Sequence, residues 1–168
     1  WYAFKYDFDD SGDSRQAPVV PRKLGLPRVL CVDDDERLLA GLELRLRRSF
    51  DVVTATSAAD ALAKLERSTP FAAVISDMRM PHADGARLLS AIRRVSPETT
   101  RILLTGHAEW EVAQQAINAG EILRALQKPC DASTLRGAVD EALRLKIQRD
   151  GRRELRMMAA GYTRELVA

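Results

Sequence analysis

The sequence predicts an α/β fold, a doubly wound sheet of five parallel strands with helices on both faces. Three observations lead to it: five short apolar runs, helical patterns that separate them, and polar residues where the runs end. Strands that alternate with helices favour parallel pairing, with both faces of the sheet buried. The 168 residues, 46% of them hydrophobic, suffice for one such domain with additional length.

The apolar runs are predicted as strands because each is too short for a helix and is bounded by turn or polar residues. They cover residues 29–32, 52–55, 72–75, 102–104 and 122–126. The patterns between them repeat apolar residues at spacings of three and four, the period of an amphipathic helix. These positions are Leu38, Leu39, Leu42 and Leu46; Ala58, Ala61, Leu62 and Leu65; Leu88, Leu89, Ile92 and Val95; and Val112, Ala113, Ala116 and Ile117.

A fifth helical pattern starts at Ser133, the expected cap, and includes residues 148–168 as a helical extension. Its apolar positions are Leu135, Val139, Leu143, Ile147, Gly151, Leu155, Met158, Tyr162 and Leu166. Beyond residue 147 no domain core is left to cover, so we expect the extension to pack against its own copy as a dimerising coiled coil. Acidic residues interrupt its basic face, which is expected to be solvated: Arg149, Arg152, Arg153 and Arg156.

Residues 1–26 are predicted as a tail and linker outside the domain. Five of the nine aromatic residues (two Trp, three Tyr and four Phe in all) lie in the first eight positions, and prolines with Gly25 follow later in the segment. The aromatic residues alternate with other residues, which fits a strand, an extended docking peptide or an unstructured tail.

Composition excludes several classes of protein. No run approaches the ~20 apolar residues that a membrane-spanning helix needs. A net charge of +2 gives no footprint for direct nucleic-acid binding. Cys31 and Cys130 have the spacing of neither a zinc site nor a disulfide framework, so free thiols and a cytoplasmic location are predicted.

The candidate functional residues follow the predicted strands. Acids follow the first and third strands, a hydroxyl the fourth and an ammonium the fifth: Asp33, Asp34, Asp35, Asp77, Thr105 and Lys128. The carboxyl ends of parallel strands meet at one edge, where ligands of such sheets bind. Clustered carboxylates suit Mg²⁺, and a lysine and a hydroxyl beside it suit phosphoryl transfer. A carboxylate can be the nucleophile, and Asp77 is the candidate because it alone ends a central strand.

Four motifs in order resemble the receiver domain of bacterial two-component response regulators. They are RVLCVDDD at residues 28–35, SDMRMP at 76–81 with Asp84 and Gly85, LTG at 104–106, and Lys128-Pro129. The resemblance covers residues 27–147 and implies a flavodoxin-like receiver fold. It also implies a signalling switch that is not an enzyme in the usual sense, in which a histidine kinase phosphorylates Asp77.

The resemblance further implies the roles of the other site residues. Asp34, Asp77 and the backbone carbonyl of Arg79 would bind Mg²⁺, with Asp33 acting through water. Thr105 would sense the phosphoryl oxygen, and Lys128 would pair with it across a cis bond to Pro129. No output domain follows, so we expect the effector to lie outside this chain.

Some positions depart from the receiver pattern or tune it. Ala125 stands where receivers commonly have Tyr or Phe, so an aromatic rotamer switch is absent there. This raises the alternative of a constitutive docking or dimerisation module. Arg79 and His107 are bulky and predict slow loss of phosphate. Trp110 is a candidate interface anchor.

A phosphatase of the haloacid dehalogenase type is the other alternative. Its nucleophile would be Asp33, with Asp35 as the acid. It is disfavoured because Arg37 follows Glu36 where that family has a small apolar residue or Thr, and because no paired acids follow Lys128.

Overall fold

The computed structural model describes residues 25–67, 70–81, 83–118 and 122–165, with only the backbone for Ala83 and residues 158–165. The predictions for the aromatic tail and for the apolar side chains at 158, 162 and 166 lie outside the described residues.

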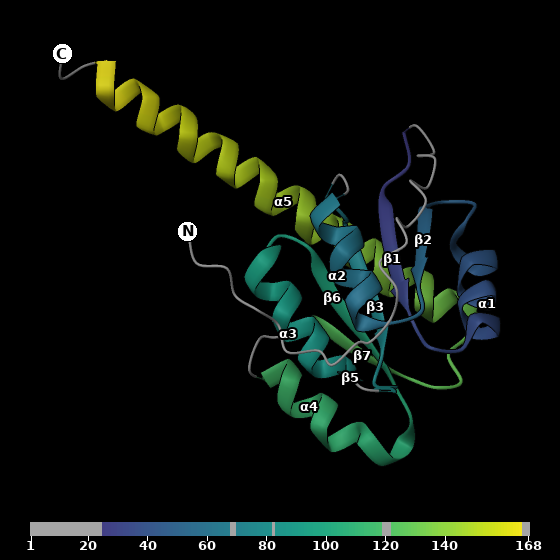
Figure 1. The fold of residues 1–168 in the computed structure, drawn as a ribbon. Helices are drawn as coiled ribbons and strands as arrows, with labels where there is room; N and C mark the ends of the chain where they lie inside the picture. Colours follow the sequence, from purple (N-terminus) through teal and green to yellow (C-terminus); the bar gives the residue numbers. More distant parts are fainter. Residues whose placement is uncertain (1–24, 68–69, 82, 119–121, 166–168) are drawn as a thin grey trace.

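Five strands form the main sheet, and all pair in parallel (Figure 1). The sheet order is β2-β1-β3-β6-β7. The chain runs through β1 (Arg28–Val32), α1 (Glu36–Leu46), β2 (Asp51–Ala55), α2 (Ala58–Arg67), β3 (Ala73–Asp77), β4 (Arg79–Met80), β5 (Ala83–Asp84), α3 (Gly85–Val95), β6 (Thr100–Thr105), the 3₁₀ turn η1 (His107–Glu109), α4 (Trp110–Asn118), β7 (Arg124–Gln127) and α5 (Ala132–Glu165). The predicted doubly wound α/β fold is confirmed, and the sheet order is that of flavodoxin-like proteins.

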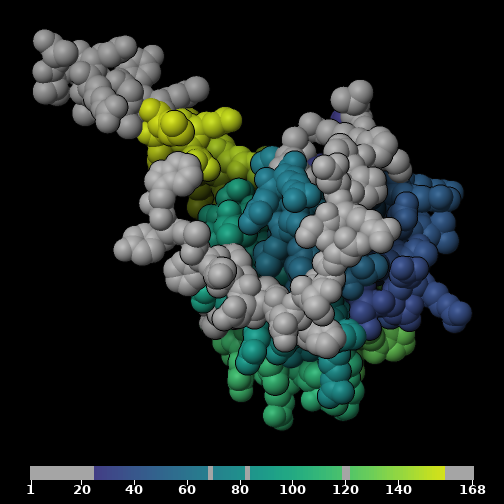
Figure 2. All heavy atoms as spheres, in the orientation of Figure 1, coloured from purple at the N-terminus to yellow at the C-terminus, as the bar shows by residue number. Residues whose placement is uncertain are grey.

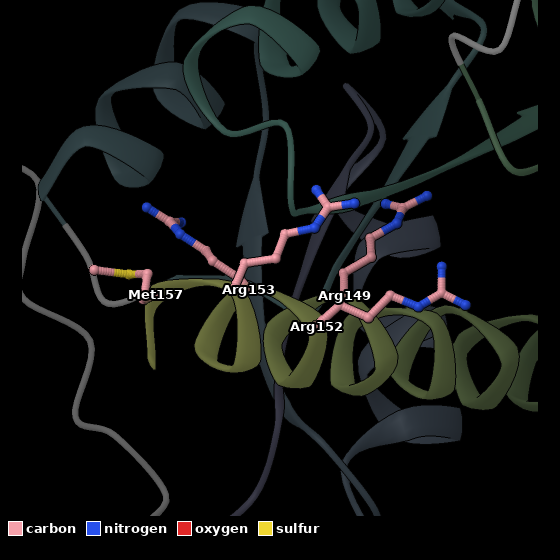
Figure 3. Close-up of a pocket in the computed structure, with 5 residues that line it drawn as sticks. Arg149, Arg152, Arg153 and Met157 are labelled. Carbon is pink, nitrogen blue, oxygen red and sulfur yellow. The ribbon is translucent and has the colours of Figure 1, made fainter. Parts of the chain in front are cut away.

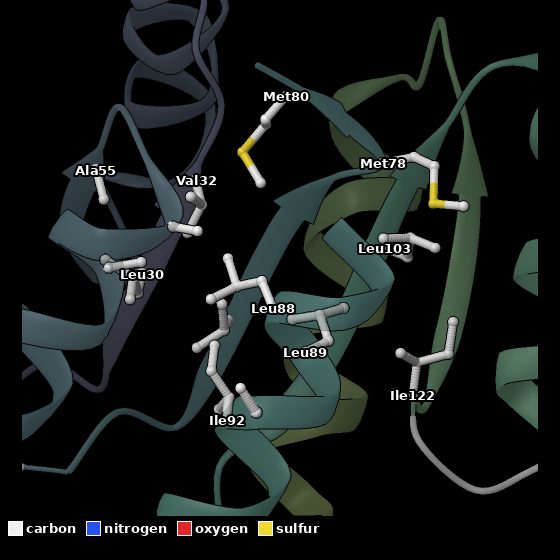
Figure 4. Close-up of a cluster of buried hydrophobic side chains, with 14 of the residues drawn as sticks. Leu30, Val32, Ala55, Met78, Met80, Leu88, Leu89, Ile92, Leu103 and Ile122 are labelled. Atoms are coloured by element: carbon white, nitrogen blue, oxygen red, sulfur yellow. The ribbon is translucent and has the colours of Figure 1, made fainter. Parts of the chain in front are cut away.

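Helices cover both faces of the sheet, and each face has its own buried cluster. Leu30, Val74 and Leu103 point to the side of α2, α3 and α4, where Leu88 and Leu89 complete the cluster (Figure 4). Their strand neighbours point to the opposite side, against α1 and α5: Val29, Cys31, Ala73, Ile75, Ile102 and Leu104. Alternate residues of each central strand are therefore buried in different layers, which accounts for the continuous apolar runs in the sequence.

The strands extend beyond the apolar runs into polar residues. β1 and β2 begin at Arg28 and Asp51, which pair across the ladder with Nε and Oδ2 3.2 Å apart. The Arg28 guanidinium also lies over the ring of Phe71, 4.6 Å from its centroid. At the other edge β3 includes Asp77 and β6 includes Thr105. Ladder hydrogen bonds come from the backbone, so hydrophobicity alone does not mark where a strand ends.

The fifth strand and the last helix start at different residues from those predicted. The strand begins at Arg124, two residues later than predicted, although Ile122 before it is buried. The helix is capped by Asp131, whose Oδ1 accepts from the amides of Ser133 and Thr134 at 2.8 and 2.9 Å. Ser133 therefore lies within the first turn and is not the cap.

Three residues assigned to the first four apolar helix patterns lie on the surface. Leu38 and Val95 are each 45% exposed, and Val112 is 46% exposed. Leu38 and Val112 lie at the margin of their helix's buried stripe, where a spacing of three or four does not decide on which side a residue falls, and Val95 is the last residue of α3. α4 instead contacts the core through Ala113 and Ala116.

A two-stranded antiparallel hairpin, β4–β5, was not predicted. It pairs Arg79 with Asp84 and Met80 with Ala83 directly after Asp77. Asp84 then caps α3 by accepting from the Ala86 amide at 2.8 Å. Strands of two residues are too short to produce a hydrophobic period, so the sequence could not indicate them.

The described part of α5 extends beyond the sheet (Figures 1 and 2). Ile147, Leu155 and Met157 are 62%, 68% and 68% exposed there. Four arginines project from one side and, with Met157, line an open pocket of about 540 Å³ (Figure 3): Arg149, Arg152, Arg153 and Arg156. Among the described residues, no helix is both long enough and apolar enough for a membrane span.

Candidate functional site

The predicted site residues lie at the carboxyl edge of the sheet. Asp33 and Asp34 follow β1, Asp77 is the last residue of β3, Thr105 the last of β6, and Lys128 comes directly after β7. β1 and β3 are neighbours in the sheet, and the chain leaves them toward opposite faces, through α1 and α3. This edge lies at the topological switch point, where open α/β sheets bind ligands.

Three carboxylates form a cluster there. Ligand oxygens of Asp33, Asp34 and Asp77 lie within 4.8 Å of one another. Asp33 and Asp77 are buried and Asp34 is exposed, so the cluster opens to solvent on one side. Hard oxygen donors with room for water fit Mg²⁺, which keeps part of its hydration shell. The donor set is therefore suited to the predicted ion.

The third acid after β1, Asp35, has a different role. Its Oδ1 accepts from the Arg37 amide at 2.8 Å and caps α1, as expected for an acid at a helix start. The Asp35 amide in turn donates to Asp33 Oδ1 at 2.9 Å, which fixes the orientation of that carboxylate. The cap of α1 thus supports the cluster.

Lys128 bridges the two buried acids. Its Nζ lies 2.7 Å from Asp77 Oδ1 and 3.1 Å from Asp33 Oδ2. Burial raises the pKa of Asp77 above its ordinary value, although the hydrogen bond and charge of Lys128 lower it. Burial alone lowers the pKa of Lys128, but hydrogen bonds to Asp77 and Asp33 and their charges raise it overall. The lysine is therefore a stable cation beside the candidate nucleophile.

Gly85 allows the hairpin to fold back closely on Asp77. A Cβ at this position would overlap the Asp77 carbonyl oxygen and lie 2.9 Å from its carbonyl carbon. The Gly85 amide also donates to the Met78 carbonyl at 2.9 Å. The absence of a side chain here therefore positions the backbone that carries the candidate acceptor.

Thr105 reaches the same edge but has another partner in this state. It is fully buried, and its hydroxyl donates to the Gly106 carbonyl at 3.2 Å. Its own carbonyl accepts from the Lys128 amide at 2.8 Å, so the ends of β6 and β7 are joined. The peptide bond from Lys128 to Pro129 is cis, as the resemblance implied.

Two residues that contact Arg79 and His107 are not identified by the sequence patterns. Glu109 Oε1 lies 2.5 Å from Arg79 Nε, and Gln127 Nε2 lies 3.1 Å from His107 Nδ1. Arg79 and His107 are the two predicted tuning residues, and both of these contacts join them to distant segments. No local pattern in the sequence marks Glu109 or Gln127.

The two other predicted positions lie around α4. Ala125 is buried on β7 in the same cluster as Ala113 and Ala116 of α4. Small side chains thus fill the region where an aromatic residue was expected in a receiver. Trp110 begins α4 and is 38% exposed, so its role as an interface anchor stays a prediction.

An open groove of about 530 Å³ adjoins the site. Its lining includes Asp33 and Lys128 of the site, the exposed Leu38 and Arg45 of α1, and Cys130. Both cysteines are free thiols, as predicted. Burial raises the pKa of Cys31 to about 12, so this thiol is uncharged.

Comparison with known proteins assigns the chain to a family. A family model described as "Response regulator receiver domain" matches residues 29–140. The transcriptional regulatory protein GlrR of Escherichia coli (strain K12) is 41% identical over 116 residues, which are 68% of this chain and 26% of that protein. The chain thus spans about a quarter of the length of the curated relatives it resembles.

Solved structures agree with this assignment. A structure described as adenylate cyclase from Rhodopirellula baltica aligns with a TM-score of 0.76 and 35% identity, covering 77% of this chain and 96% of that one. The signal receiver domain of an HD domain-containing protein from Pseudomonas fluorescens Pf-5 aligns with a TM-score of 0.70 and 36% identity, covering 82% and 99%. The chain belongs to the response regulator receiver domain family, the signalling modules of two-component systems.

Proposed function

We propose that Asp77 accepts a phosphoryl group from a histidine kinase in a Mg²⁺-dependent reaction. The observation that supports this best is the contact of Asp77 Oδ1 with Lys128 Nζ at 2.7 Å, inside a cluster of three carboxylates. A structural ion pair between Asp77 and Lys128 would not need Asp33 and Asp34 beside it. Phosphoryl transfer needs an oxygen nucleophile with positive charge around it, which Lys128 and a cation held by the acids would supply. Family membership makes the role of a phosphoacceptor switch the natural one for this edge.

Each side chain of the site has a separate role in the proposed phosphoryl transfer. An Asp77 carboxylate oxygen bonds to phosphorus while the bond from phosphorus to the donor nitrogen breaks, which forms an acyl phosphate. Lys128 offsets negative charge on the transferred group. Thr105 turns its hydroxyl from the Gly106 carbonyl to a phosphoryl oxygen. Asp33, Asp34, Asp77 and the Arg79 carbonyl would hold Mg²⁺, which supplies further charge neutralisation.

The lifetime of the acyl phosphate is proposed to be long. Arg79 lies two residues after Asp77 and His107 two residues after Thr105, and both have bulky side chains. Bulky side chains at these positions would obstruct a water molecule on its way to phosphorus. Loss of the phosphoryl group is therefore expected to be slow.

We also propose a homodimer formed through the extension of α5. Ile147 and Leu155 are strongly exposed, and successive residues of a helix are rotated by about 100°. This rotation puts the four arginines on one side, as Figure 3 shows, with Ile147 opposite them and Leu155 between Ile147 and Arg152. Two such apolar stripes can cover each other while the arginines stay in water. Trp110 is a second proposed contact, to a partner or an output domain.

Phosphorylation is tested by intact mass after incubation with acetyl phosphate and Mg²⁺. The unaltered chain is expected to gain one phosphoryl group, and Asp77→Asn none. Asp140→Asn, an exposed acid on α5, serves as the matched control and should be phosphorylated normally. Chelation of Mg²⁺ should abolish the gain. A phosphoryl group that persists in Asp77→Asn would disprove the assignment of the acceptor.

The alternative of a constitutive docking module rests on Ala125. It predicts that beryllofluoride with Mg²⁺ changes neither tryptophan fluorescence nor oligomeric state. A response in either measurement excludes it.

A further inference from the structure

The segment that follows Thr105 contacts two other parts of the chain, one close to Asp77 and one close to Lys128. On one side Glu109 pairs with Arg79, two residues after Asp77. On the other side His107 contacts Gln127, directly before Lys128. Residues 105–109 are thus connected both to the hairpin that follows Asp77 and to β7, which precedes Lys128.

The carboxylate of Glu109 lies against this loop. A Cβ on Gly106 would be 2.9 Å from Glu109 Oε2, so the acid folds back over the residue that follows Thr105. Its side chain is only 15% exposed, whereas that of Arg79 is 78% exposed. The arginine is therefore the accessible partner, and the acid is the one fixed to the loop.

Phosphorylation would introduce a competitor for Arg79. A phosphoryl group on Asp77 brings a charge of roughly −1.5 to −2 and several acceptor oxygens. Guanidinium groups bind such oxygens in a bidentate manner. Arg79 lies two residues after the acceptor, on the hairpin β4–β5. Its side chain could therefore bind either Glu109 or the phosphoryl group on Asp77.

We propose that Glu109 is a positioning residue that holds residues 105–109 in the unphosphorylated arrangement through Arg79. The phosphoryl group takes Arg79 from Glu109, and the released loop and the start of α4 then rearrange. This ion-pair exchange transmits the signal in a domain that has Ala125 in place of an aromatic switch. The inference rests on the proposed phosphorylation of Asp77.

The proposed exchange predicts how the Arg79–Glu109 pair affects the affinity for a phosphoryl mimic. A ligand shifts an equilibrium only by its different affinity for the two states. Weakening the Arg79–Glu109 pair should therefore favour the released state without ligand and strengthen binding of a phosphoryl mimic. Removing Arg79 should abolish the effect of Glu109, since the acid then has no partner to release.

The experiment uses Trp110, which directly follows Glu109, as the reporter. The chain has two tryptophans, so Trp1→Phe leaves Trp110 alone. Beryllofluoride with Mg²⁺ is titrated into this parent, into Glu109→Gln and into Glu111→Gln. Glu111 is an exposed acid two residues away, so its variant controls for the loss of one negative charge.

Glu109→Gln is expected to shift the ligand-free emission toward that of the saturated parent. It should also bind beryllofluoride about two- to fivefold more tightly, the range that one partly exposed ion pair allows. Glu111→Gln should match the parent. Emission and affinity in Glu109→Gln equal to those of the parent would overturn the proposal.

A double-mutant cycle separates this role from a purely structural one. In an Arg79→Gln background, Glu109→Gln should change neither the emission nor the affinity further. An equal effect in both backgrounds would show that Glu109 acts through Gly106 alone, and would overturn the exchange. Phosphorylation of the parent by acetyl phosphate, followed by intact mass, reports separately whether the proposed function holds.

Discussion

Single side chains at the carboxyl edge of the sheet determine what this site can do. Lys128 contacts both buried acids, so two carboxylates that would repel each other are kept close by one cation. Removing Lys128 would leave the buried carboxylates of Asp33 and Asp77 without a compensating cation. The loss of folding stability would be larger than if both charges of an ion pair were replaced by apolar groups. The same cation that allows the acids to cluster is also the one available to a phosphoryl group.

Gly85 is the most demanding position for backbone packing near the acceptor. Gly85→Ala should lower the free energy of unfolding by about 1–3 kcal/mol, because its Cβ would overlap the Asp77 carbonyl and displace the hairpin. The displaced acceptor should also be phosphorylated more slowly by acetyl phosphate. Urea denaturation and the time course of intact mass measure the two effects.

Gly137 provides a matched control for this substitution. It lies in α5, and a Cβ there would meet nothing within 4 Å. Gly137→Ala should raise the free energy of unfolding by up to about 1 kcal/mol through helix propensity. It should leave phosphorylation unchanged. Equal stability effects of both substitutions would contradict the packing argument at Gly85.

At the level of the elements, helix starts are fixed by acids at the sheet edge. Asp35, Asp84 and Asp131 cap α1, α3 and α5, each through bonds to amides of the first turn. Asp35 directly follows Asp34, and Asp131 comes three residues after Lys128, which couples the orientation of α1 and α5 to the site. The cap of α5 is the one that the sequence placed wrongly, at Ser133.

Asp131 predicts a pH dependence of stability. Hydrogen bonds from Ser133 and Thr134 hold the pKa of this carboxyl well below its ordinary value. A lowered folded-state pKa stabilises the fold above the unfolded-state pKa of about 3.9, and this contribution is lost as pH falls through the folded-state pKa. Asp131→Asn should thus lower the melting temperature near neutral pH, and the difference should shrink below about pH 4.

Thermal unfolding followed by circular dichroism over a pH series measures this difference. Asp140→Asn, which removes an exposed acid from the same helix, should show little change at any pH. A difference for Asp131→Asn that is constant from neutral to acid pH would mean that its charge contributes nothing.

At the level of the whole molecule, α5 serves both the domain and its exterior. Its first part buries Leu135, Ala138 and Val139 against the sheet, while Ile147 and Leu155 are exposed farther along. One continuous helix therefore connects the layer beside the site to the proposed dimer contact. A change at the site has a direct structural route to that contact.

The proposed dimer depends on the apolar side of the extension. Leu155→Gln should weaken dimerisation more than about tenfold, because each copy loses a buried side chain worth roughly 1.5–3 kcal/mol. Arg149→Gln puts the same side chain on the arginine side and should leave the dimer intact. Sedimentation equilibrium distinguishes them. Equal dissociation constants for the two variants would place the contact elsewhere.

Local patterns predict the five strands of the main sheet, the helices that cover it and the residues of the candidate site. The spacing of Leu88, Leu89 and Ile92 predicts α3, and Asp77 and Lys128 were identified because they follow apolar runs. Such patterns come from residues adjacent along the chain, whose side chains repeat with the period of a helix or strand. Parallel strands align their ends, so polar residues after several strands could be assigned to one edge before any contact was known.

Tertiary structure alone decided which side chains meet. Arg79 lies in β4 and Gln127 in β7, whereas Glu109 and His107 lie in η1, and no periodic pattern relates such residues. The exposure of Val112 and the two-residue strands of the hairpin were likewise unpredictable, since packing and turn geometry decide them. The sequence by itself determined the fold class and the chemical types gathered at its edge. The three-dimensional packing of separate elements determined the ion pairs and hydrogen bonds around the acceptor, because these contacts join residues that are distant along the chain.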